Sequence, residues 1–133
     1  MLASSKDSQI AVIYFSNPER DDQKSVEGLS GARPELKGTV GDLSQYDTIF
    51  LGYPIWWGDL PMPVYTFLEC HDLAGKKVII FSTHGGSGLA GTVETITHLE
   101  NGADVVQNAY TISRDDVTEA APSLSNWLKQ LGY

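Results

Sequence analysis

The sequence has little of three things: cysteine, basic side chains and long apolar runs. It contains one cysteine, Cys70, in 133 residues, so an internal disulfide is excluded and the reducing cytoplasm is the expected location. Only 9 lysines and arginines stand against 17 aspartates and glutamates, a net charge of -8, which argues against DNA, RNA and anionic membrane surfaces as partners. No apolar run has the roughly 20 residues that a membrane-spanning helix needs. Nucleic-acid and membrane functions are therefore not expected.

The length predicts a single domain that is large enough to bury a core. The first nine residues, MLASSKDSQ, are polar and too short to form a secretory signal. Residues 1–9 are therefore expected to be a disordered or tag-like tail, and residues 10–133 to be the folded domain.

Four short apolar runs predict β-strands, and they are Ile10–Ser16, Thr48–Pro54, Lys77–Thr83 and Ala103–Ile112. The first three are almost continuously apolar, as is typical of strands buried on both faces of a parallel sheet. Helical patterns lie between or after these runs, at Met62–Leu73, Leu89–Glu100 and 115–133. In the second helix, one face is expected to carry Leu89, Val93, Ile96 and Leu99. Alternation of strand and helix predicts an α/β fold with right-handed crossovers.

The stretch between the first two runs does not follow this alternation. Residues 17–46 are polar and glycine-rich, with few periodic apolar positions. They predict a loop with at most a helical turn around Gln23–Leu29, and no strand.

Two loops at strand ends carry the functional signal, because ligands of open parallel sheets bind beyond the carboxyl ends of the strands. The second run ends in YPIWWGDLP, where Trp56 and Trp57 are either packing residues or a platform for a ligand. The third run ends in THGGSG, Thr83–Gly88, whose glycines let a flat ligand approach the backbone. The alternative for this loop is a flexible segment in which Ser87 caps the next helix. Together the loops predict a slot for a planar ring.

The segments TIFLGYPIWWGDLPMPVYTFLE and VIIFSTHGGSGLAGTV resemble the flavodoxin family, in particular its short bacterial members. The resemblance covers IAVIYFS and then runs from about Arg33 to the C-terminus. It implies a three-layer α/β/α sandwich that holds FMN across the strand ends. It also implies that FMN is bound by Ser16, Pro54, Ile55, Trp56, Trp57, Gly58, Thr83, His84, Gly85, Gly86, Ser87 and Gly88, with Ser16 opening the phosphate loop.

The sequence departs from the family pattern after Ser16, where NPERDD replaces the expected glycine–threonine loop. The phosphate-binding loop, the first helix and the edge strand are all missing from the pattern. A four-stranded sheet is therefore expected, and FMN binding is weakened or lost if no other group holds the phosphate. The first strand would also have an unpaired edge, which predicts a homodimer through that strand or a loop folded over it.

The predicted function is that of an FMN-dependent electron-transfer protein, in which no side chain is catalytic and no metal is bound. Its partner is expected to be a redox protein or a small acceptor. An acidic surround would disfavour the reduced, anionic flavin and lower its potential. Two alternatives stay open: a flavin-free domain that acts by binding a partner, and a quinone reductase of the same fold. A hydrolase is disfavoured, since His84 has serines nearby but no G-x-S-x-G motif is present.

Overall fold

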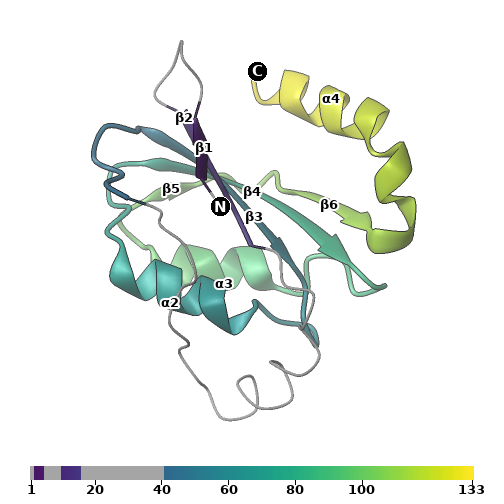
Figure 1. Ribbon diagram of the computed structural model, residues 1–133, viewed down its shortest axis with the longest axis horizontal. Helices are drawn as coiled ribbons and strands as arrows, with labels where there is room; N and C mark the ends of the chain where they lie inside the picture. Colours follow the sequence, from purple (N-terminus) through teal and green to yellow (C-terminus); the bar gives the residue numbers. More distant parts are fainter. Residues whose placement is uncertain (1, 5–9, 16–40) are drawn as a thin grey trace.

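The computed structural model describes residues 2–4, 10–15 and 41–133. Within these residues a six-stranded sheet forms the centre of the molecule (Figure 1). Its strands are β1 (Leu2–Ser4), β2 (Ile10–Tyr14), β3 (Thr48–Pro54), β4 (Lys77–His84), β5 (Asp104–Val105) and β6 (Tyr110–Ser113). The order is β1-β2-β3-β4-β5, and β6 also pairs with β4. All pairs from β2 onward are parallel, which confirms the predicted α/β fold.

Helices cover both faces of the sheet, as a three-layer sandwich requires. In Figure 1, α2 (Met62–Cys70) and α3 (Thr92–Leu99) lie on one face, and α4 (Ala121–Gln130) lies on the other. A 3-10 helix, η2 (Arg114–Glu119), connects β6 to α4. None of the helices in the described part of the chain has the length and apolar character of a membrane span.

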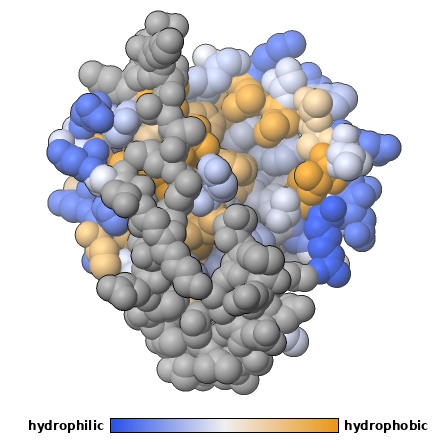
Figure 2. Space-filling view, in the orientation of Figure 1, coloured by the Kyte–Doolittle hydropathy of each residue, from blue (hydrophilic) through white to orange (hydrophobic). Residues whose placement is uncertain are grey.

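The two faces of the sheet build two separate apolar cores. The larger core joins α2 and α3 to β2, β3 and β4, with Phe67, Ile80 and Ile96 fully buried. On the other face, Trp127 of α4 packs edge-to-face on Phe50, with ring centroids 6.3 Å apart. Figure 2 shows the apolar side chains of the visible face towards its middle and the hydrophilic ones along its flanks. Residues 48–53 of β3 are all buried, because this strand has a covered face on each side.

Several of the predicted boundaries differ in the structure. The helix predicted at Met62–Leu73 ends at Cys70, and the helical pattern at 115–133 gives η2 followed by α4, which begins at Ala121. The fourth apolar run is divided into β5 and β6, since the four residues 106–109 stand opposite only Ile79 and Ile80 of β4. The helix predicted over Leu89–Glu100 begins at Thr92. Its last residue, Leu99, is 41% exposed, whereas it was expected on the buried face.

The reason for the exposure of Leu99 is the angular spacing of the helix. Val93 and Ile96 define the buried stripe, and the next position on that stripe is four residues after Ile96. That position is Glu100, which is only 8% exposed. An acidic side chain therefore occupies a place that the pattern assigns to an apolar one.

The strand β2, which is the first strand that the sequence predicts, has a neighbour that the sequence did not predict. Residues 1–9 were expected to be a tail, but Leu2–Ser4 pair antiparallel with β2, with Leu2 opposite Ile13. This pairing gives the outer edge of β2 a partner, and unpaired backbone groups on such an edge are costly. The loop expected at 17–46 lies largely within residues 16–40, which are outside the described residues. The expectation that this stretch contains no strand therefore stays a prediction. The homodimer stays a prediction.

Replacing Glu100 by glutamine should stabilise the protein at neutral pH. Burial raises the pKa of Glu100 above its usual 4.5. The hydrogen bond that its carboxylate accepts from the Leu73 N–H lowers the pKa, and the negative charge of the nearby Asp72 raises it further. With a raised folded-state pKa, the stability that protonated Glu100 contributes is present below pH 4.5 and is lost as the pH rises through the folded pKa. Glu100→Gln removes the buried charge and keeps an acceptor oxygen. We expect a higher melting temperature than wild type at pH 7, and a smaller difference near pH 4.5.

The matched control is Glu94→Gln, an exposed position on the same helix. The difference between its melting temperature and that of the wild type should not grow as the pH rises. Equal effects of the two variants, or a larger gain for Glu100→Gln at the lower pH, would contradict this account.

Candidate functional site at the carboxyl ends of β3, β4 and β6

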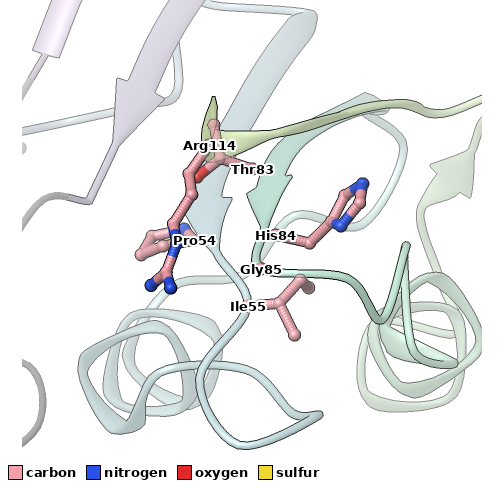
Figure 3. Close-up of a pocket in the computed structure, with 6 residues that line it drawn as sticks. All are labelled: Pro54, Ile55, Thr83, His84, Gly85 and Arg114. Atoms are coloured by element: carbon pink, nitrogen blue, oxygen red, sulfur yellow. The ribbon is translucent and has the colours of Figure 1, made fainter. Parts of the chain in front are cut away.

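The register of β3 and β4 brings the two predicted loops side by side. Pro54 stands opposite Thr83, and the Ile55 N–H donates to the Thr83 carbonyl oxygen at 2.8 Å. A pocket of about 150 Å³ opens at this point. It is lined by Pro54, Ile55, Thr83, His84, Gly85 and Arg114 (Figure 3).

The pocket contains part of the set of residues that the sequence predicted. Five predicted residues line it: Pro54, Ile55, Thr83, His84 and Gly85. The others on the same two loops lie beyond its wall: Trp56, Trp57, Gly58, Gly86, Ser87 and Gly88. Ser16 lies outside the described residues. The pocket is smaller than the ~300–1,000 Å³ of common ligand sites, so it has room for only part of a ligand that such sites hold.

The two tryptophans are separated by a tight turn. Trp56 and Asp59 exchange two backbone hydrogen bonds of 2.9 and 3.0 Å, which leaves Trp57 and Gly58 as the two residues of the turn. Both have positive φ, 54° and 74°, as a type I′ turn requires. Asp59 fixes the turn, because its Oδ1 accepts from the Leu60 N–H at 2.7 Å and from the Tyr65 hydroxyl at 2.8 Å.

This turn gives the two indole rings opposite environments. Trp56 is 2% exposed and Trp57 is 73% exposed. The buried Nε1 of Trp56 has no hydrogen-bond partner among the described residues, which costs about 1–3 kcal/mol for a buried donor. Trp56 is therefore a packing residue, and Trp57 is the ring that is available to cover a ligand.

The glycine-rich loop presents backbone donors rather than side chains. His84 orders the loop, since its Nδ1 accepts from the Gly86 N–H at 2.9 Å. Within the described part of the chain, the N–H groups of Gly85, Ser87 and Gly88 form no hydrogen bond. Ser87 does not cap the next helix: Gly91 is the N-cap of α3 and no side chain caps it. The capping alternative for this loop is therefore wrong.

A buried hydrogen-bond chain fixes the far end of this loop. The Tyr53 hydroxyl donates to Thr92 Oγ1 at 2.9 Å, and Thr92 donates to the Leu89 carbonyl oxygen at 2.7 Å. Burial raises the pKa of Tyr53 to about 12, against the opposing effect of the bond to Thr92. The phenol consequently stays protonated at neutral pH and ties β3 to the first turn of α3.

Arg114 is a residue of the pocket that the sequence analysis missed. It follows β6, where Ser113 stands opposite His84, and Ser113 Oγ accepts from the Asp115 N–H at 3.3 Å. A Cβ placed on Gly85 would lie 3.5 Å from Arg114 Cζ, so the guanidinium packs along the loop backbone. In Figure 3 the Arg114 side chain runs towards Pro54, with His84 on the other side of Gly85.

These features define an α/β protein with a pocket at the carboxyl edge of a parallel sheet. A family model for flavodoxin matches residues 14–131, so the chain belongs to the flavodoxin family.

Solved structures agree with this fold. A Bacteroides uniformis protein named as a flavoprotein is 24% identical, with a TM-score of 0.67 over 80% of this chain and 91% of its own. A Bacteroides eggerthii protein with the same kind of name is 28% identical, with a TM-score of 0.58 over 72% of this chain and 58% of its own. A Lactobacillus acidophilus flavoprotein, solved in complex with FMN, is 21% identical, with a TM-score of 0.55 over 95% of this chain and 76% of its own.

Replacing Trp57 by asparagine should relieve backbone strain in the turn and stabilise the protein. A tryptophan with a φ of 54° is strained, and Asn-Gly is the dipeptide that type I′ turns prefer. We expect Trp57→Asn to raise the free energy of unfolding by about 1 kcal/mol, measured by urea denaturation. Trp57→Ala is the control, because it removes the same ring but lacks the short polar side chain with which asparagine stabilises a left-handed backbone. Equal stabilities of the two variants would contradict the strain.

Proposed function

We propose that this protein binds FMN and serves as an electron-transfer flavoprotein. The observation that carries the proposal is the pairing of an exposed, strained Trp57 with a glycine loop in which the N–H groups of Gly85, Ser87 and Gly88 have no acceptor among the described residues. These two features follow adjacent strands at the carboxyl edge of the sheet. The FMN complex of the L. acidophilus flavoprotein supports the choice of ligand.

The residues present suit the ring portion of FMN. The N–H groups of Gly85, Ser87 and Gly88 would donate to the polar edge of the ring, and Trp57 would stack on its face. When bound, FMN supplies the one- or two-electron chemistry. The chain binds and orients the ring and shields part of it from water. His84 Nδ1 is engaged by Gly86, so the neutral imidazole carries its proton on Nε2.

The partner in this proposal is a redox protein or a small electron acceptor. The net charge of -8 would favour association with a basic protein and slow the approach of anionic cofactors. This electrostatic preference weakens as salt is added, because charges beyond a Debye length are screened.

Calorimetric titration with FMN tests the proposal, with the absorption spectrum of the purified protein as a second readout. We expect saturable binding and visible flavin bands. Trp57→Ala should weaken binding about tenfold, since stacking contributes roughly 0.5–1.5 kcal/mol beyond the area it buries. Tyr133→Ala, which removes another exposed aromatic ring, is the matched control and should leave the affinity within twofold. No flavin bands and no heat of binding in the wild type would overturn the proposal.

The same titration with riboflavin measures the contribution of the phosphate. The family phosphate loop is absent from the sequence, so we expect the affinities for FMN and riboflavin to differ by much less than a hundredfold, which is roughly 2.7 kcal/mol. A preference for FMN of a hundredfold or more would show that a phosphate site exists elsewhere in the chain.

A further inference from the structure

We propose that Arg114 holds negative charge at the ring end of the site, so that the site favours the reduced, anionic form of the bound ring over its oxidised form. This inference rests on the proposed function and deepens it. It assigns a direct ligand contact to a residue outside the set that the sequence predicted.

The first argument is position along the sheet. Arg114 follows β6, and the order from the first parallel strand to β6 is β2-β3-β4-β6. Neighbouring strands lie ~4.8 Å apart, so the end of β6 is about 14 Å from the end of β2. The phosphate loop of the family begins at the end of β2, whereas Arg114 lies with the two ring-binding loops. A contact to the ring is therefore favoured over a contact to the phosphate.

The second argument is local charge. Arg114 is the one residue with a permanent charge among those that line the pocket. Asp115 and Asp116 follow it in the chain and are exposed, and within the described residues no ion pair joins Arg114 to a carboxylate. The lining of the pocket therefore includes one positive charge and no negative one, although the whole protein carries a charge of -8.

The third argument is that the guanidinium of the exposed Arg114 lies against the backbone of the glycine loop. Gly85 has no Cβ, and the space that a Cβ would occupy there is 3.5 Å from Cζ and 3.6 Å from Nε of Arg114. The strands β4 and β6 are paired just before Gly85 and Arg114, with Thr83 opposite Ile112. The backbone that leads to each of the two residues is therefore fixed by the sheet. A planar guanidinium in such a position can donate two parallel hydrogen bonds to an anionic edge.

The chemical consequence concerns charge balance. A flavin ring that takes up two electrons and one proton from a two-electron donor carries one more negative charge than the oxidised ring. A fixed cation beside it binds the reduced form more tightly and raises the midpoint potential. This effect is opposite to the lowering of the potential that the net acidity alone predicts.

The test is the two-electron midpoint potential of the FMN-loaded protein, with dithionite as the reductant, together with the affinities for oxidised FMN and riboflavin. For Arg114→Gln we expect reduced FMN to bind at least tenfold more weakly relative to oxidised FMN, which lowers the potential by at least about 30 mV. Arg114→Lys should keep part of the effect, because it keeps the charge but not the planar donor pair. Lys129→Gln is the matched control: it removes one exposed positive charge at the end of α4 and should shift the potential by much less.

The outcomes are distinct. An Arg114→Gln potential equal to that of the wild type would overturn the inference and leave FMN binding intact. A loss of affinity for FMN without a loss for riboflavin would assign Arg114 to the phosphate and also overturn it. If Lys129→Gln lowered the midpoint potential as much as Arg114→Gln does, only the net charge of the protein would matter, and the inference would be overturned. A wild type that binds no flavin would overturn the proposed function and this inference together.

Discussion

The pairing of β3 with β4 is the interaction on which the rest of the structure depends. Seven residues of each strand are in register, from Thr48 opposite Lys77 to Pro54 opposite Thr83. Because the strands are parallel, both leave the sheet at the same edge, and the loops that follow them must be neighbours. The helices on both faces bury this ladder. The site is therefore a consequence of strand register, and the loops contribute only the chemistry.

The features of the site that reduce the stability of the fold are concentrated at the turn after β3. Trp57 has a left-handed backbone that suits asparagine or glycine, and Trp56 buries an indole N–H without a partner. Both features oppose folding, whereas the Asp59 hydrogen bonds and the buried strand before the turn favour it. Strain that persists because its surroundings impose it is typical of binding sites. The turn trades stability for an exposed ring on the loop that follows β3.

Patterns within a segment were sufficient to predict part of this structure. The continuous apolar runs identified β2, β3 and β4, and the order of the chain then placed the loops around Pro54 and Thr83 together. Features that arise between segments were not predictable in this way. The strand Leu2–Ser4 has no strand pattern of its own and forms because β2 offers it a partner. Arg114 stands in a polar stretch and becomes a pocket residue only through the pairing of β6 with β4. The burial of Glu100 follows from helix phase, which hydrophobicity alone does not reveal.

The three tryptophans have one more consequence, which is optical. Trp57 is 73% exposed, whereas Trp56 and Trp127 are 2% and 6% exposed. Trp127 donates its indole N–H to the Asn108 carbonyl oxygen at 2.9 Å, whereas that of Trp56 has no partner in the described part of the chain. Indole fluorescence shifts to longer wavelength as water surrounds the excited ring, so emission from Trp57 lies at the red edge of the spectrum and the buried pair emits at shorter wavelength. Red-edge emission therefore reports the surroundings of Trp57, and the blue side reports the burial of Trp56 and Trp127.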